Sequence, residues 1–280
     1  MPLQPLLILD GDSLAHRAFH GLPKTTRDSA ERAAGSLLGF GSMLLTLWLS
    51  QRPRSVIACW DTLETPTYRH EALPSYQAGR EFAPELVEQL DRLPELVESF
   101  GFLVAKGAGF EADDFLAAAA AAETAAGGAS LIVTSDRDAF QLVSESVTVL
   151  RPQRGVSVLE RVGPSDVREA YGVEPAQVCD FIALRGDPSD GIRGARGIGP
   201  VKAAATLAQF GSLEGALAAG QFDAEAKALR LYREIATMRT DAPLPELVDV
   251  SLDWARARAW AAELGLDSLA ERLPASAPDG

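Results

Sequence analysis

The sequence predicts an α/β fold, in which a mostly parallel central sheet flanked by helices is followed by a helical region. Short apolar runs alternate with longer helical patterns through about the first 160 residues, and this order is typical of parallel strands joined by crossover helices. After that point the strand signals stop, and short helical patterns are joined by Gly and Pro turns. The 280 residues are 47% apolar, which is enough for a buried core and excludes disorder as the main state.

The expected elements follow from these runs in order. Strands are expected at residues 6–9, 56–60, 102–104 and 131–134. Helices are expected at residues 29–50, with Ser29 as the cap, at 84–100, and at 111–126, where Gly127-Gly128 ends an Ala-rich stretch. A boundary near Gly163-Pro164 separates residues 1–163, expected to form the sheet domain, from the helical residues 164–280.

Composition excludes several classes of protein. Cys59 and Cys179 are too few for a disulfide framework or a thiolate zinc site, and we expect both in the core. The longest apolar stretch, residues 37–49, is shorter than the ~20 residues of a membrane span. Residues 1–10 lack the basic start of a secretory signal, so the cytoplasm is the expected location. The formal net charge of −13 argues against a nucleic-acid binder, unless many acids are metal ligands.

Acidic residues stand at the ends of the expected strands. Asp10, Asp61 and Asp136 come at or just after a C-terminal strand end, and Glu111 follows residues 102–104 across a short loop. The carboxyl ends of parallel strands meet at one edge of a sheet, so these acids should converge there. Three neighbouring acids bring the number of carboxylates to seven: Asp113, Asp114 and Asp138. So many like charges require a cation, and hard oxygen ligands suit Mg²⁺ or Mn²⁺.

Taken singly, each acid also has a structural interpretation. Asp10 and Asp61 suit the turn after a strand, and the acids at 111–114 suit the first turn of a helix, where the dipole favours them. Asp136 and Asp138 suit helix caps. The joint placement of all of them at strand ends favours a metal centre.

A Gly-rich segment at residues 186–202 forms the second candidate site. Gly197 and Gly199 allow the backbone to approach a phosphate, and the helix expected after them offers free N–H groups. Three cations surround this turn: Arg193, Arg196 and Lys202. The pattern predicts a hairpin between two helices that holds a nucleic-acid backbone, with a plain Gly-rich connector as the alternative. Asp187 and Asp190, just upstream, suit a metal rather than a phosphate.

A third feature lies between Asp61 and the helix expected to begin near Pro84. Rings and cations interleave here: Tyr68, Arg69, His70, Tyr76, Arg80 and Phe82. Rings can stack on unpaired bases and arginines can bind phosphates bidentately, so the segment is a candidate nucleic-acid contact. An ordinary surface loop is the alternative, and His70 taken alone is a solvated surface residue.

Together these segments resemble the 5′-nuclease family, which comprises flap endonucleases, phage 5′-exonucleases and the N-terminal nuclease domain of bacterial DNA polymerase I. The resemblance runs from about Leu6 to beyond Lys202. It rests on the order and spacing of six segments: residues 9–11, 68–71, 76–80, 111–114, 134–138 and 186–202. It implies a PIN- or resolvase-like sheet domain followed by a helix-hairpin-helix region.

The resemblance implies two metal clusters, with one divalent ion in each. The acids implied around the first are Asp10, Asp61, Glu111, Asp113 and Asp114. Those implied around the second are Asp136, Asp138, Asp187 and Asp190, with Asp113 close to both. The resemblance also implies a helical arch at about residues 62–93, and a helix-hairpin-helix at about 187–210 that binds duplex DNA, often with a K⁺ ion. If these acids are ligands, the rest of the chain is close to neutral.

One position departs from the family pattern. The arch segment usually reads Tyr-Lys-x-x-Arg, whereas this chain has Gln77 where the lysine is expected. Arg80 matches the family arginine and Arg17 matches a basic residue after the first strand, so the resemblance implies a catalytic role for both at the scissile phosphate. Three further residues are expected to contact DNA together with Arg80 and the hairpin: Tyr68, Arg69 and Tyr76.

These observations predict a monomeric enzyme that hydrolyses DNA phosphodiester bonds at 5′ ends or flaps with two Mg²⁺ or Mn²⁺ ions, in replication or repair. At 280 residues, a standalone nuclease is expected rather than part of a polymerase. Two alternatives stay open: a non-catalytic binder of branched DNA, with an arch impaired by Gln77, and an RNA-directed nuclease. A nucleotide-dependent oxidoreductase is not supported, because no G-x-G-x-x-G follows the first strand.

Overall fold

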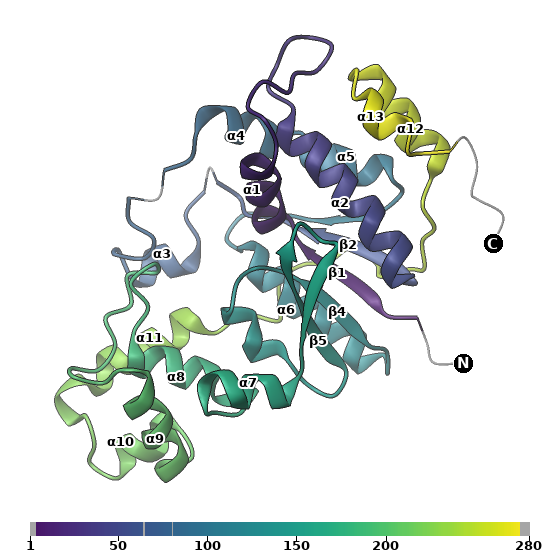
Figure 1. Cartoon of the computed structure of the whole chain (residues 1–280). Coiled ribbons are helices and arrows are strands. Elements are labelled where there is room, and N and C mark those ends of the chain that lie inside the picture. The colour runs from purple at the N-terminus through teal and green to yellow at the C-terminus, as the bar shows by residue number, and fades with distance from the viewer. Residues whose placement is uncertain (1–3, 64, 80, 275–280) are drawn as a thin grey trace.

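The computed structural model describes residues 4–63, 65–79 and 81–274. A six-stranded sheet runs through it in the order β3-β2-β1-β4-β5-β6 (Figure 1). Its strands are β1 (Leu6–Asp10), β2 (Ser55–Cys59), β3 (Leu103–Ala105), β4 (Ser130–Val133), β5 (Val147–Arg154) and β6 (Val158–Val162). The first five strands are parallel and β6 is antiparallel to β5, so the expected fold class is confirmed.

Burial on both faces explains the composition of the central strands. Every residue of β1, β2 and β4 is buried, as expected for parallel strands covered by helices on both sides. The four expected strands lie within one or two residues of their predicted bounds. The apolar pattern does not predict β5 and β6, because Arg151 interrupts β5 and Gln153 and Arg154 at its end are exposed.

One face of the sheet is covered by helices from both ends of the chain. These are α1 (Gly11–Gly21), α2 (Gly35–Gln51), α4 (Pro84–Leu90), α5 (Leu93–Ser99), α12 (Trp254–Glu263) and α13 (Asp267–Ala270). Their buried side chains form one core with Leu7 and Leu9 of β1. Figure 1 shows α12 and α13, in yellow, beside α2 and α5, so the chain after residue 253 packs on its own first half.

The opposite face carries one helix from the first half of the chain and a group of later helices, part of which extends away from the sheet (Figure 1). These are α6 (Ala112–Ala125), α7 (Pro164–Tyr171), α8 (Val178–Arg185), α9 (Pro200–Phe210), α10 (Leu213–Ala218) and α11 (Ala226–Ala236). Their core includes Leu6 and Ile8 of β1, with Phe115 of α6 and Phe181 of α8. The short helix α3 (Tyr68–Ala72) contacts α11. Three 3₁₀ helices complete the described elements: η1 (Asp138–Leu142), η2 (Pro175–Gln177) and η3 (Asp223–Glu225).

Two expected helices differ in their bounds, and one helix is not predicted. The helix expected at residues 29–50 begins at Gly35, because Ser29 donates its N–H and hydroxyl to carbonyls near the end of α12 instead of capping α2. The helix expected at 84–100 is split into α4 and α5, with Pro94 in the first turn of α5, where a missing N–H is tolerated. The apolar pattern does not reveal α1, whose polar side lines a cavity. None of the helices in the described part of the chain combines the length and apolar character that crossing a bilayer requires.

Candidate metal centre and nucleic-acid interface

Asp10 ends β1 and begins the site. Its Oδ1 accepts a hydrogen bond from the Ser13 backbone N–H at 2.9 Å, which caps α1, and its Oδ2 accepts one from the Thr134 hydroxyl at 2.5 Å. The pKa of the Asp10 carboxyl is raised to about 7, mainly by burial and to a smaller extent by the nearby carboxylates of Asp136 and Asp61, while these two hydrogen bonds oppose the shift. The structural interpretation of Asp10 is therefore correct, since its side chain caps α1, and the same side chain also lines the crevice.

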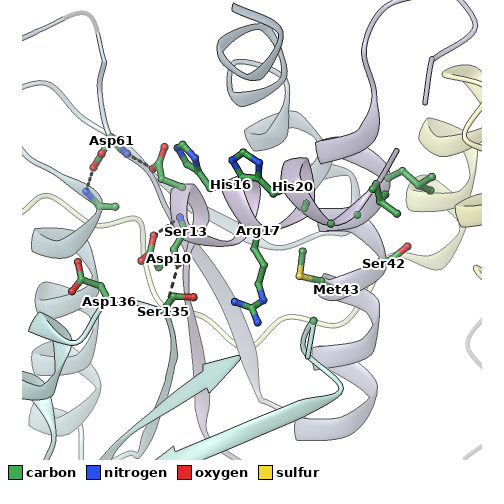
Figure 2. Close-up of a pocket in the computed structure, with 18 of the residues that line it drawn as sticks. Asp10, Ser13, His16, Arg17, His20, Ser42, Met43, Asp61, Ser135 and Asp136 are labelled. Carbon is green, nitrogen blue, oxygen red and sulfur yellow. Dashed lines mark hydrogen bonds between the residues drawn. The ribbon is translucent and has the colours of Figure 1, made fainter. Parts of the chain in front are cut away.

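Asp61 connects the neighbouring strand to α6. Its Oδ1 accepts a hydrogen bond from the Ala112 N–H at 2.8 Å, at the start of α6. Its own N–H donates to Asp12 Oδ2 at 2.8 Å, so Asp12 holds the chain after β2 against α1. The two bonds fix Asp61 beside Asp10, where Figure 2 shows both carboxylates at the end of α1.

The N-terminus of α6 supplies two more acids. Glu111 is the N-cap of α6, and its carboxylate accepts hydrogen bonds from the Thr67 hydroxyl at 2.7 Å and the Tyr76 hydroxyl at 2.9 Å. Burial raises the pKa of Asp113 well above its usual range, and the charges of Asp136 and Asp10 add to this shift. The predicted first group of acids is therefore brought together at the strand ends, with Asp114 as an exception.

Asp114 points away from that group into the protein. It is fully buried, and its two oxygens accept hydrogen bonds from the Arg69 guanidinium at 2.9 and 2.8 Å. The same carboxylate accepts the backbone N–H groups of Glu111 and Arg239. With its oxygens already held by these donors, Asp114 does not fit the metal-ligand role expected of it.

Arg69 and Tyr76 are likewise inward-facing, which contradicts the DNA contacts expected of them. Arg69 is 2% exposed, and it also donates to the Ile235 carbonyl and lies 3.2 Å from Glu111. Tyr76 is buried with its hydroxyl on Glu111, and half-buried Tyr68 donates its hydroxyl to Asp114. Since ring stacking and phosphate binding require exposed groups, Arg69 and Tyr76 organise the acids instead, while the DNA contact expected of Tyr68 stays a prediction.

The second expected group of acids comes from two loops. Asp136 and Asp138 follow β4, and the Asp138 N–H donates to Asp136 Oδ1 at 2.8 Å. Asp187 and Asp190 come from the loop after α8, where Asp187 accepts hydrogen bonds from Ser189 and Arg185. The pKa of Asp138 is raised to about 8, first by burial and then by the charges of the other three acids, against the effect of Arg185. Burial also raises the pKa of Asp190 to about 6, so charge crowding extends across both groups.

The chemical type of the ligand atoms, carboxylate oxygens, fits a hard divalent cation. Apart from Asp114, all the predicted ligands supply carboxylate oxygens to one edge of the sheet, and their mutual repulsion would be relieved by positive charge. As placed in the described residues, no three His, Cys, Asp or Glu side chains converge closely enough to hold one ion by themselves. Mg²⁺ keeps several waters and takes only one or two carboxylates directly, so it does not require three converging side chains.

A cavity of about 1180 Å³ extends from the acids along α1. It is lined at one end by Asp10, Asp61, Asp113 and Asp136, and further along by side chains of α1, α2 and α13. Arg17 lies on α1 and donates to the Gln153 carbonyl at 2.9 Å; Figure 2 shows it pointing away from His16 and His20. Arg80, the other expected catalytic cation, lies outside the described residues.

Sequence reasoning missed two residues that hold the first group of acids. Asp12 and Thr134 are both buried, and they bond Asp61 and Asp10 respectively. Both are adjacent to predicted site residues, since Asp12 follows Asp10 by two positions and Thr134 comes just before Ser135-Asp136. Polar residues at the end of a buried strand, where an apolar run stops, are the signal that could have identified them.

The Gly-rich segment joins α8 to α9 as a turn between two helices. Gly197 has a φ of 74°, which favours glycine, and Gly199 is the N-cap of α9. The Lys202 ammonium donates to the Gly197 carbonyl at 3.0 Å across the turn. The side chains of Arg193 and Arg196 are exposed on the same segment, so the expected hairpin and its cations lie on the surface.

Two family models match consecutive parts of the chain. The N-terminal resolvase-like domain of 5′-3′ exonucleases matches residues 5–172, and their C-terminal SAM fold matches residues 173–258. DNA polymerase I from Mycobacterium bovis is 41% identical over 210 residues, covering 74% of this chain and 23% of the relative. Thermostable DNA polymerase I from Thermus filiformis is 37% identical over 254 residues, covering 87% and 29%. The chain spans about a quarter of the length of these curated relatives.

Solved structures share the fold at low identity. The bacteriophage T5 5′-exonuclease with bound divalent zinc has a TM-score of 0.70 at 20% identity, covering 96% of this chain and 98% of that one. Human GEN1 in complex with Holliday junction DNA has a TM-score of 0.59 at 14% identity, covering 94% and 68%.

An acidic crevice at the carboxyl edge of a mostly parallel sheet, beside a Gly-rich helical hairpin, defines a resolvase-like nuclease class of protein. Within that class, the chain belongs to the 5′-3′ exonuclease family. The family match confirms the resemblance indicated by the motifs.

Proposed function

We propose that this chain is a structure-selective 5′-nuclease that hydrolyses DNA phosphodiester bonds at 5′ ends or 5′ flaps. The observation that supports it best is the joint placement of eight carboxyl groups at one edge of the sheet, which cannot all ionise together without cations. A binding protein that only recognises a phosphate backbone has no use for this concentration of negative charge. The setting of the reaction, in replication or repair, follows from the DNA polymerase I relatives.

The residues of the two groups would hold one ion each. Asp10, Asp61, Glu111 and Asp113 form the proposed first set, and Asp136, Asp138, Asp187 and Asp190 the second. When bound, divalent ions supply an activated water and stabilise charge on the attacking and leaving oxygens of the phosphodiester. We propose Mg²⁺ or Mn²⁺ for both positions, because every donor is a hard oxygen.

The chain's own groups then orient the substrate. Arg17 lines the cavity beside the acids and would bind a phosphate, and Arg80 has the same proposed role. The exposed cations of the hairpin, within about residues 187–210, would hold duplex backbone without reading its sequence. A K⁺ ion in that hairpin and an arch at about residues 62–93 that selects a 5′ end remain predictions. So do a nuclease domain at residues 1–163, a DNA-binding region at 164–280, a monomeric state and a cytoplasmic location.

One observation favours a second function. Gln77 is neutral where the family pattern has a lysine, and its amide is engaged with Asp190 at 3.2 Å. A chain that lost that cation would bind branched DNA without cutting it. The experiment therefore uses 5′-labelled flap DNA with Mg²⁺, Mn²⁺ or EDTA, and compares wild type with Asp136→Ala and with Glu169→Ala, which removes an exposed acid from α7.

The proposed nuclease is supported if cutting near the flap junction needs metal, is lost in Asp136→Ala and persists in Glu169→Ala. Tight flap binding without cutting in either metal would instead identify the non-catalytic binder. Faster cleavage of an RNA flap than of the matching DNA flap would favour the RNA-directed alternative.

A further inference from the structure

The arch segment and the loop of the second acid group touch each other directly. The residues concerned are 73–79 of the arch segment and 186–191 of the loop. A Cβ atom built on Gly191 would lie 2.2 Å from the Ser75 carbonyl oxygen, so the two backbones meet without room for a side chain. Gly191 also has a φ of 71°, a conformation that favours glycine. This contact brings residues 75–77 of the arch segment close to Asp190.

Gln77 extends this backbone contact into the acids. Its φ of 45° is in the left-handed region, which is unusual for a residue with a side chain and carries strain. Its Nε2 donates to Asp190 Oδ1 at 3.2 Å and to the Tyr76 hydroxyl at 3.0 Å. The Tyr76 hydroxyl in turn donates to Glu111 Oε2 at 2.9 Å. One continuous series of hydrogen bonds therefore joins an acid of the second group to an acid of the first.

Gln77 also stands where two cavities meet. The large cavity along α1 and a smaller one of about 350 Å³ under the arch segment share three lining residues, Asp61, Gln77 and Glu111. The smaller cavity is otherwise lined by arch residues such as Thr67, His70 and Phe82. A side chain at this shared boundary can hold the arch segment in place and face the metal-binding edge at the same time.

We propose that Gln77 is a positioning residue that latches the arch segment to the acids and sets the spacing between the two acid groups. The inference rests on the proposed metal site. Through Asp190 and the Tyr76 hydroxyl, the carboxamide orients one carboxylate of each group. It adds no charge, so it does not compete with a cation for either acid.

The neutrality of Gln77 separates this role from that of a lysine. An ammonium at the same position would pair with Asp190 and Glu111, whose charges it would partly neutralise in the metal-free protein. A divalent ion would then have to displace the ammonium group or bind against its positive charge. Gln77→Lys should therefore bind divalent ions more weakly than wild type, whereas Gln77→Met, similar in length and without hydrogen-bond donors, should loosen the segment.

The test measures Mn²⁺ binding by calorimetry and backbone amide exchange at Tyr76 and Ala78, without DNA. Both amides donate within the turn that carries Gln77, so they report its opening. In Gln77→Met these amides should exchange roughly tenfold faster, as expected for loss of a hydrogen bond to a charged group, and Mn²⁺ affinity should fall several-fold. Gln221→Met, at an exposed position, is the matched control and should behave as wild type.

Two further results decide the outcome. Tyr76→Phe removes only the relaying hydroxyl, and it should weaken Mn²⁺ binding while the Gln77 bond to Asp190 is retained. If wild type binds Mn²⁺ and Gln77→Met matches it in both affinity and exchange, the latch is wrong. If wild type itself binds no Mn²⁺, the proposed metal site fails, which is a different result.

Discussion

The pair formed by Arg69 and Asp114 offers the sharpest test of how the site is built. Both are almost completely buried, and two guanidinium N–H groups donate to the two carboxylate oxygens at 2.9 and 2.8 Å. In Arg69→Met the carboxylate keeps its backbone donors but loses both of these charge-assisted bonds in a buried site. Removing one partner of a buried pair costs about 3–5 kcal/mol of unfolding free energy. At roughly 2–4 °C per kcal/mol, the melting temperature should fall by about 10 °C.

The assay is urea unfolding followed by circular dichroism, together with flap-DNA affinity at fixed salt. Arg193→Met is the matched control, because Arg193 is exposed on the hairpin and should lose DNA affinity without losing stability. Arg69→Met should show the opposite pattern while it stays folded. If Arg69→Met unfolded at the wild-type urea concentration and only its DNA affinity fell, Arg69 would be a DNA contact and the structural argument would be refuted.

Three further predictions concern the acids, the loop contact and the hairpin. Because the acids repel one another, Mg²⁺ should raise the melting temperature of the wild type. Asp113→Asn should raise the melting temperature without metal and reduce the Mg²⁺ effect, and an equal Mg²⁺ shift in wild type and variant would contradict this. Gly191→Ala should destabilise the protein in urea unfolding by at least ~2 kcal/mol more than Gly197→Ala, because both glycines have positive φ but of the two only Gly191 faces a backbone oxygen within 3 Å. Similar losses in the two variants would mean that the two loops separate freely. Flap-DNA affinity should fall steeply with salt concentration. The double variant Arg193→Ala/Arg196→Ala should reduce the slope of log affinity against log salt concentration by about 2, and an unchanged slope would place the phosphate contacts elsewhere.

Local patterns were sufficient for the central strands and for most of the acidic residues. Residues 6–9 and 131–134 are unbroken apolar runs, because a strand buried on both faces has no polar side to alternate with. Asp10 and Asp61 stand where such runs end, and the carboxyl edge of a parallel sheet brings those ends together. Predicting their convergence therefore needed only the strand order along the chain.

The orientation of neighbouring acids could not be predicted in this way. Asp113 and Asp114 are adjacent in sequence and lie on one helix turn, but consecutive helix residues point about 100° apart, so only one of them faces the crevice. Which one does so depends on Arg69, which reaches Asp114 from a different segment. The sequence marks both as acids at a helix start and does not distinguish them.

By itself, the sequence determined the α/β class, the edge of the sheet at which the acids gather and the family to which the chain belongs. These depend on periodicity, on residue type at strand ends and on motif spacing, all of which are local. Only the tertiary structure decided that Tyr76 and Arg69 face inward, that α12 and α13 pack on α2 and α5, and that Gln77 joins the two acid groups. Each of these outcomes depends on partners far apart in the chain, whose meeting is set by packing of the whole fold rather than by any local pattern.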